Sequence, residues 1–385
     1  MRTLPTIAAA GSLMVAAFGC GPMTELGLVK PKPSNGGIVH QYTESADGGH
    51  ANVYWFDTQA GPIVVDVPLT TSETKKMRGK MIRPYRIYIT EADPVRFGGL
   101  AVMKNPDVPA YTTPAIATEI QAHGDQRLAV YRRRIGDNVP AHVDAPVPAI
   151  EERNHDMIGE VEVELLPLGP AAAEASLAVF IPKTGELITG DVVAGKEHLD
   201  LTWGRSKVWQ DRIAELKALE PRLIYPGHGA TGGAELLDDT LAYLKTFHDI
   251  VGAKVKQGAP AKISRADATD IKRQMLAKYP KLGRPELLDR SIPAEYAVQL
   301  AELAPAPPAE GTTPPALGTA PAGTSPTAAT PGGAATNTGA KPASTTAGTT
   351  SSTAPAAGGA SGGMDDLLGA DTGGSSKSKK KKGKK

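Results

Sequence analysis

Residues 88–99 read Y-I-T-E-A-D-P-V-R-F-G-G, and the interpretation of the whole chain depends on this stretch. Its first residues complete a predicted strand at 86–89, where aromatic and β-branched side chains precede a polar connection. The connection begins where that strand ends, and Gly98 and Gly99 are expected to open the next helix or turn. Glu91, Asp93 and Arg96 therefore stand together in one short loop.

Three other segments share the glycine-rich or strand-like character of this loop: I-V-V-D at 63–66, L-I-T-G-D at 187–191 and Y-P-G-H-G at 225–229. In content and order, the four segments resemble the motifs of the metallo-β-lactamase superfamily. The metal-binding loop of that family usually reads T-H-x-H-x-D-H-x-G-G, and its later motifs read L-x-T-G-D and P-G-H-G. The N-V-Y-W-F run at 52–56 also resembles the family strand that pairs with I-V-V-D. The resemblance covers most of residues 32–251.

The resemblance implies an α/β fold, the metallo-β-lactamase αββα sandwich, which we expect at residues 35–303. Short apolar runs that alternate with helical periodicity also favour a mixed α/β domain. Strands are expected at 38–40, 52–56, 63–66, 86–89, 161–165 and 177–182. Helices are expected at 70–80, 117–122, 207–219 and 236–251, with surface connections at 132–134 and 139–148. Residues 266–303 should add helices at the C-terminal end of this domain.

Enzymes of the superfamily hold two metal ions, usually zinc, whose bound water or hydroxide attacks an ester, thioester, amide or phosphodiester. Seven positions of this sequence correspond to the metal ligands: Glu91, Asp93, Val95, Arg96, Ala172, Asp191 and His228. Glu91, Asp93 and Ala172 would face the first ion, and Val95, Arg96 and His228 would face the second. Asp191 would bridge the two ions. Only Asp191 and His228 keep the expected chemistry. The acid that matches Asp66 supports the loop in the family and does not bind metal.

The second metal position is the easier one to judge. Val95 has no donor atom, and Arg96 carries a permanent positive charge where a cation would sit. We therefore expect Arg96 to pair with Asp191, Asp93 or Glu91, so that a guanidinium replaces the charge of the metal.

The first metal position leaves two alternatives. Glu91, Asp93 and Asp191 could converge, and an oxygen set of this kind suits Mg²⁺, Mn²⁺ or Ca²⁺ better than zinc. In the alternative that we favour, the acids are satisfied by Arg96, by nearby backbone or by water. The candidate metal ligands are thus Glu91, Asp93, Asp191 and His228. The expected cofactor is none or a single divalent ion (Mn, Mg, Ca or Zn).

Three hypotheses about function follow. The first is a binding or scaffolding module with a degraded dinuclear zinc site. The second is a metal-dependent hydrolase of an ester-like or phosphoester bond that uses a carboxylate-rich site. The third is a structural envelope protein. The folded region has no cysteine and no G-x-S-x-G elbow, so nothing indicates a nucleophilic triad. His198 is expected at the surface, and His248 at the surface or in packing.

The first 19 residues have the short positive start and the apolar run of a secretory signal. Cys20 follows Ala17-Phe18-Gly19 and resembles a lipobox cysteine, which predicts lipidation at this position. An ordinary secreted protein with an unpaired cysteine is the alternative. Residues 20–34 would form a tether, and the protein would be exported to the bacterial envelope and lipid-anchored. Gly21 favours the outer membrane.

The other end of the chain is rich in Ala, Pro, Gly, Thr and Ser at 304–374, and such a segment is expected to be disordered. The tail at 375–385 contains seven lysines, which exceed the net charge of +1, so the remainder of the chain carries −6. A tail of this kind binds polyanions weakly and in a salt-dependent way. For an exported protein, acidic polysaccharide, lipid phosphate or an acidic protein is the expected partner, and nucleic acid is not. A solvated tail without a partner is the alternative.

Overall fold

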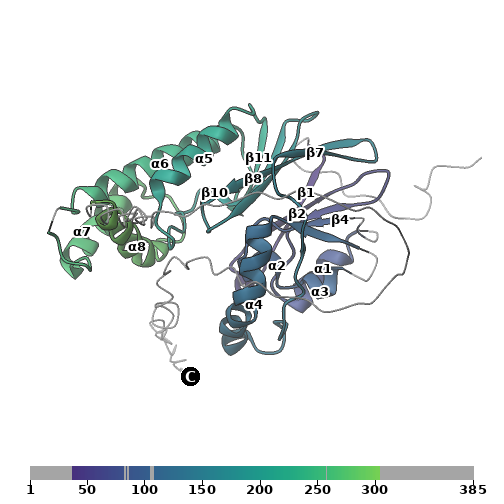
Figure 1. Cartoon of the computed structure of the whole chain (residues 1–385), viewed down its shortest axis with the longest axis horizontal. Helices are drawn as coiled ribbons and strands as arrows, with labels where there is room; N and C mark the ends of the chain where they lie inside the picture. The colour runs from purple at the N-terminus through teal and green to yellow at the C-terminus, as the bar shows by residue number, and fades with distance from the viewer. Residues whose placement is uncertain (1–36, 82–83, 85, 105–107, 257, 304–385) are drawn as a thin grey trace, which may run out of the picture. The chain divides into compact units, whose positions relative to one another are not determined.

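The computed structural model describes residues 37–303, apart from 82–83, 85, 105–107 and 257. The predictions for the signal sequence at 1–19, for Cys20, for the tether at 20–34 and for residues 304–385 lie outside the described residues. Within the described part of the chain, two sheets lie next to each other with helices on their outer sides (Figure 1).

The first sheet has six strands in the order of the sequence. They are β1 (Val39–Thr43), β2 (Asn52–Phe56), β3 (Ile63–Val65), β4 (Arg86–Tyr88), β5 (Ala110–Thr112) and β6 (Val147–Pro148). β1, β2 and β3 are antiparallel, whereas β3, β4, β5 and β6 run parallel. Parallel neighbours need crossover connections, and helices supply them here.

The second sheet has five strands in the order β11-β10-β9-β8-β7. They are β7 (Asn154–Ile158), β8 (Val161–Gly169), β9 (Ser176–Ile181), β10 (Glu186–Gly195) and β11 (Leu223–Gly229). β10 and β11 are parallel, and the other pairs are antiparallel. β9 is buried along its whole length because this sheet is covered on both faces, which explains its continuous apolar sequence.

The helices form two groups, one on the side of each sheet (Figure 1). The first group is α1 (Thr71–Arg78), α2 (Pro94–Phe97), α3 (Leu100–Met103) and α4 (Pro114–Ile135), and a short 3-10 turn, η2 (Ala46–Gly48), joins β1 to β2. The second group is α5 (Ser206–Lys217), α6 (Glu235–Gly252), α7 (Arg265–Lys278) and α8 (Leu287–Glu302). None of the helices in the described ranges is both long enough and apolar enough to cross a membrane.

Two apolar cores agree with these layers. One core joins the facing sides of the two sheets, and Val64 of β3 and Val179 of β9 both belong to it. The other lies between the outer face of the second sheet and the second group of helices, with Phe180 of β9 and Trp209 of α5 among its members. Adjacent residues of β9 thus enter different cores, as the alternation of side chains along a strand requires. The predicted αββα sandwich with additional C-terminal helices is confirmed.

Some expected boundaries were wrong. α4 begins at Pro114, after the cap residue Thr113, whose hydroxyl accepts from the amide of Ile116, and it continues to Ile135. Arg132, Arg133 and Arg134 therefore lie in the last turns of a helix and do not form a loop; cations are favourable there because the C-terminal end of a helix is negative. The connection expected at 139–148 ends in strand β6.

Candidate functional site

The candidate site lies where parallel strands end. Asp66 follows β3, and Thr90 and Glu91 follow β4. Asp191 lies in the middle of β10, and His228 lies at the carboxyl end of β11. In sheets of this kind, ligands bind at the carboxyl ends of the strands. The fold thus brings together most of the positions that the sequence singled out.

Asp66 shapes the loop that follows β4. Its carboxylate accepts from the amide and from the hydroxyl of Thr90, each at 2.8 Å. Asp66 itself has a left-handed backbone with φ 63°, a conformation that few residues other than glycine adopt. The two bonds to Thr90 compensate for this strain and fix the start of the loop. The expectation that this acid supports the loop agrees with the contacts.

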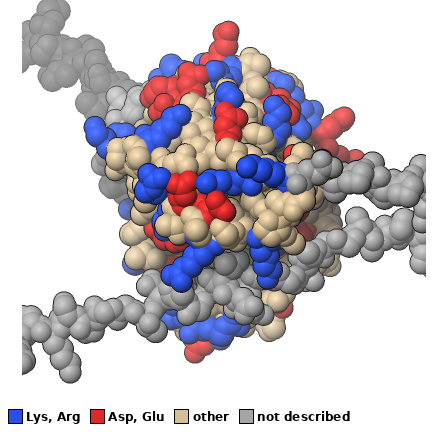
Figure 2. All heavy atoms as spheres, turned by 90° about the vertical axis from the view of Figure 1, so that its left-hand side faces the viewer, with Lys and Arg blue, Asp and Glu red and all other residues tan. Residues whose placement is uncertain are grey.

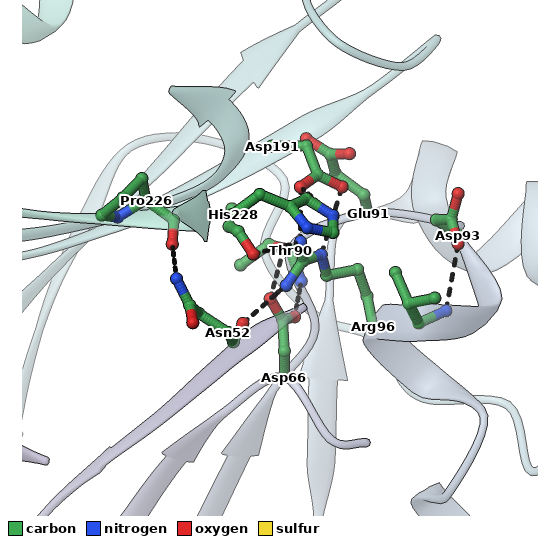
Figure 3. Close-up of polar contacts among 12 residues, drawn as sticks. Asn52, Asp66, Thr90, Glu91, Asp93, Arg96, Asp191, Pro226 and His228 are labelled. Carbon is green, nitrogen blue, oxygen red and sulfur yellow. Dashed lines mark hydrogen bonds and ion pairs between the residues drawn. The ribbon is translucent and has the colours of Figure 1, made fainter. Parts of the chain in front are cut away.

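Arg96 lies at the centre of the site and is fully buried. Its Nε donates to Oδ2 of Asp191 at 3.2 Å, and its Nη2 donates to Oδ1 of Asp191 and, at 2.9 Å, to the carbonyl of Gly227 (Figure 3). Nη1 donates to the carbonyl of Asn52 at 2.6 Å and lies 3.7 Å from Oδ2 of Asp66. The contact expected between Arg96 and an acid is therefore made with Asp191, in a bidentate form.

The charges of this pair stabilise each other. Burial alone would raise the pKa of Asp191, but the guanidinium of Arg96 lowers it below its ordinary value. Burial alone would lower the pKa of Arg96, but the charges of Asp191 and Asp66 raise it. Both side chains are thus ionised, as a buried pair with good hydrogen bonds requires.

Glu91 and Asp93 make different contacts. Glu91 is buried, and its Oε1 accepts from the hydroxyl of Ser176 at 3.0 Å. Burial, and then the charge of Asp191, raises its pKa well above the ordinary value. Asp93 caps helix α2, because its Oδ1 accepts from the amide of Val95 at 3.0 Å. It lies apart from Asp191 and Glu91 (Figure 3). The three carboxylates do not converge on one point.

Three further positions that correspond to metal ligands offer few donor atoms: His228, Val95 and Ala172. Nε2 of His228 lies 3.5 Å from Oδ1 of Asp191, and its Nδ1 is buried without a hydrogen-bond partner. Burial lowers the pKa of His228 to about 3, so the ring is neutral at ordinary pH. Val95 and Ala172 are buried in the two apolar cores.

These residues do not fit the zinc pair that is typical of the superfamily. A zinc site takes about four N, S or O ligands in a tetrahedron. Within the described ranges, no three His, Cys, Asp or Glu side chains are grouped so that they could hold a metal ion. Both oxygens of Asp191 are bonded to Arg96, and the guanidinium brings a positive charge to the place between Asp191 and Gly227.

Sequence reasoning missed the backbone partners of Arg96. The carbonyl groups of Asn52 and Gly227 accept from its guanidinium. Every residue has a backbone carbonyl, so the residue types do not predict such a contact. One signal was present in the P-G-H-G segment. A Cβ atom at Gly227 would lie 2.3 Å from Oδ1 of Asp191 and 2.5 Å from Nη2 of Arg96. Only glycine leaves room for the ion pair at this position.

The two other histidines whose surroundings were predicted from the sequence differ from each other. His198 was expected at the surface, and this expectation was wrong, because the ring is buried and its Nδ1 lies 2.9 Å from the hydroxyl of Tyr243 on α6. α6 covers the ring, and the amide of His198 donates to the carbonyl of Gly283 at 2.9 Å in the segment between α7 and α8, so long-range packing and not the local sequence buries this residue. His248 packs as expected, with Nδ1 3.0 Å from the hydroxyl of Ser206 and 3.1 Å from Oε1 of Glu295.

Comparison with solved structures finds proteins of similar fold. One is a metallo-β-lactamase from Pontibacter korlensis, with 17% identical residues, a TM-score of 0.44, and coverage of 54% of this chain and 94% of that chain. Another is TMB-1, described for substrate and inhibitor binding, with 18% identity, a TM-score of 0.45, and coverage of 56% and 96%. No family model matches the sequence. At these identities the likeness concerns the fold alone.

Proposed function

We propose that the folded domain is a binding or scaffolding module with a degraded zinc site, and not a zinc hydrolase. The observation that carries this proposal is the buried guanidinium of Arg96, which takes both oxygens of Asp191. Hydrolysis in the superfamily needs a water whose pKa is lowered by bound metal. A fixed arginine in place of the second ion supplies neither the metal nor an open coordination position.

The alternative hydrolase with a carboxylate-rich site would require larger changes. Asp93 would have to leave the first turn of α2, and Glu91 would have to exchange the hydroxyl of Ser176 for a cation. Asp191 would have to release Arg96, which would then be a buried cation without its closest counter-charge. These contacts favour the non-catalytic proposal.

Metal analysis of the purified full-length protein tests this proposal. We expect far less than one divalent ion per chain after growth in metal-supplemented medium. Glu91→Gln and Asp93→Asn serve as matched controls, since each removes one charge with little change in shape. A stoichiometric ion in the wild-type protein that is lost in both variants would contradict the proposal. So would hydrolysis of ester, thioester or phosphodiester substrates that depends on Asp191 and His228.

We further propose that the protein is an exported lipoprotein of the bacterial envelope, anchored through Cys20 and facing an anionic partner with its lysine tail. The sequence of residues 1–20 and the seven lysines of 375–385 support this part of the proposal. Two acyl signals hold a protein to a bilayer more firmly than one. Cys20→Ser should move the protein from the membrane fraction to the soluble fraction. Unchanged membrane association of that variant would contradict anchoring through a lipid on Cys20.

The charge distribution on the face that α7 and α8 form gives no preference for polyanions, which supports the tail as their proposed site. Around α7 and α8, basic and acidic side chains are mixed (Figure 2). Lys254 lies 3.1 Å from Asp267, and Lys272 lies 2.6 Å from Asp289. Mixed pairs of this kind create little net field on that face. Deletion of residues 375–385 should therefore abolish salt-sensitive binding to vesicles that contain anionic lipid.

A further inference from the structure

We infer that Arg96 occupies a cation site that belongs to the fold itself, an all-oxygen cage whose ligand is a guanidinium ion. The inference rests on the proposed absence of zinc and goes beyond it. The oxygen cage consists of both carboxylate oxygens of Asp191, the carbonyl oxygens of Asn52 and Gly227, and Oδ2 of Asp66. In the native protein the occupant of the cage is covalently attached, because it is a side chain of the same chain.

The composition of the oxygen cage differs from that of the zinc positions. Two of its groups are backbone carbonyls, and Asp191 is the one zinc-position side chain among them. It contains no nitrogen or sulfur donor. Guanidinium presents its N–H groups in one plane and matches carboxylates in a bidentate way. The contacts of Nε and Nη2 with Asp191 have this geometry.

The oxygens of Asp66, Asn52 and Gly227 lie in segments that are held by contacts that do not involve Arg96. Asp66 is held by Thr90. The amide nitrogen of Asn52 donates to the carbonyl groups of Pro226, at 3.1 Å, and Gly229, at 2.8 Å. These bonds fix the segment that contains Gly227 from both sides. A preformed set of acceptors needs little ordering when a ligand binds. The backbone of the cage should therefore persist when its native occupant is removed, and a free guanidinium ion would again supply the counter-charge of Asp191 and Asp66.

The cage also connects the two sheets. Asn52 lies in β2 and Asp66 follows β3, whereas Asp191 lies in β10 and Gly227 in β11. One buried cation thus holds oxygens from both halves of the sandwich. Without it, the carboxylates of Asp66 and Asp191 would face each other with no counter-charge, which is a costly arrangement in a protein interior.

Chemical rescue of Arg96→Ala in the full-length protein tests the inference. This variant should lose about 10 °C in Tm, because a buried charge is left unpaired. Millimolar methylguanidinium chloride should restore at least half of this loss in a saturable way, whereas equal sodium chloride should not. In the Arg96→Ala background, Asp191→Asn should abolish the rescue, since it removes the bidentate partner.

Arg127→Ala is the matched control. Arg127 also bonds to one carboxylate, that of Glu119, and to one carbonyl, that of Ala92 at 2.6 Å, but its side chain is 12% exposed and its acceptors are fewer. Methylguanidinium should leave the Tm of this variant unchanged. Equal rescue of both variants would show a general solvent effect and overturn the inference. Rescue of Arg96→Ala by Ca²⁺ and not by methylguanidinium would overturn the assignment of the ligand.

If Arg96→Ala does not fold in cells, refolding from urea with and without methylguanidinium gives the same information. The yield of folded protein should rise only with the ligand, and no rise would overturn the inference. The double variant Arg96→Met/Asp191→Asn should be more stable than Arg96→Met alone, because the second change removes the unpaired charge. The metal content of the wild-type protein tests the proposed absence of zinc, whereas the rescue experiment tests the guanidinium cage. A failure of one proposal can therefore be distinguished from a failure of the other.

Discussion

Glu44 is a further buried carboxylate near the site, and it lacks the compensation that Asp191 has. Its Oε1 accepts from the amide of Leu69, while its Oε2 is buried without a hydrogen-bond partner. Burial raises its pKa to about 8; the charge of Arg96 opposes this shift and that of Glu73 adds to it. Glu44 is therefore protonated in the folded protein at neutral pH.

Stability should depend on pH through Glu44. The unfolded chain releases this proton near pH 4.5 and the folded protein only near pH 8, so stability falls as pH rises between these values. The slope is at most about 1.4 kcal/mol per pH unit. Glu44→Gln keeps the shape without the charge and should flatten this slope. Urea unfolding of both proteins at several pH values measures it, and parallel curves would refute the assignment.

Gly227 is the residue that leaves space for the ion pair. Gly227→Ala should destabilise the protein by about 1–3 kcal/mol, because the added methyl group overlaps Asp191 and Arg96. Gly79→Ala is a suitable control, since the nearest atoms to its Cβ are 3.5 Å away and the φ of Gly79 is −68°. Thermal unfolding of both variants provides the measurement. Equal stability of the two variants would contradict the prediction, because it would mean that Asp191 and Arg96 can move away from the methyl group without a loss of stability.

Among the elements, α8 holds the loop that follows β10. The amide of Leu201 in this loop donates to the hydroxyl of Ser291 at 2.9 Å, and the amide of Ser206 donates to Oε2 of Glu295 at 3.0 Å. Ser291 and Glu295 are both buried on α8. The helices added at the C-terminal end thus position a segment that begins a few residues after Asp191.

Ser291→Ala should loosen this loop without unfolding the domain. The buried amide of Leu201 loses its acceptor, at a cost of about 1–3 kcal/mol. Amide hydrogen exchange should accelerate at Leu201 and its neighbours and remain unchanged in the first sheet. Thr269→Ala on α7 is the control, because its hydroxyl bonds to the carbonyl of Arg265 within its own helix and is exposed. Unchanged exchange at Leu201 would mean that other contacts hold the loop.

Element prediction succeeded where local pattern and packing agree. The helix predicted at 207–219 corresponds to α5, and Trp209, Ile213 and Leu216, which recur at helical spacing, are all buried in the structure. Element prediction found α4 but underestimated its length, because only five of the 22 residues are buried and the apolar pattern is weak beyond the first turns. The length of a mostly exposed helix depends on its caps and on its long-range contacts.

At the scale of the whole molecule, the two sheets are joined by polar contacts as well as by the shared core. The hydroxyl of Tyr54 donates to the carbonyl of Pro226 at 2.6 Å, and the amide of Leu177 donates to the carbonyl of Thr90 at 2.8 Å. Arg96 adds a charged connection between the same two halves. None of these contacts depends on an exchangeable ligand.

Chelation should therefore leave the stability of the wild-type protein unchanged. A ligand that binds the folded state raises stability by mass action, and its removal lowers it. We expect the same Tm in EDTA, in buffer alone and with added zinc, measured by calorimetry on full-length protein. A zinc-dependent protein of similar fold is the positive control. A fall in Tm with EDTA would place an exchangeable metal in the core.

The sandwich class and the positions of several strands could be predicted from the sequence, because periodicity is a property of residue types, whereas the order of the strands within each sheet came from the structure. The missing zinc ligands could be predicted for the same kind of reason, since donor atoms are also a property of residue types. The sequence also limited the partners of Arg96 to three acids. The tertiary structure selected Asp191, 95 residues away, and added the carbonyl of Gly227, 131 residues away. These choices depend on which segments the fold brings together, and a backbone carbonyl is chemically the same at every position. The stretch at 88–99 thus predicted missing zinc ligands and an acidic partner for Arg96, and only the folded chain showed which oxygens surround the guanidinium.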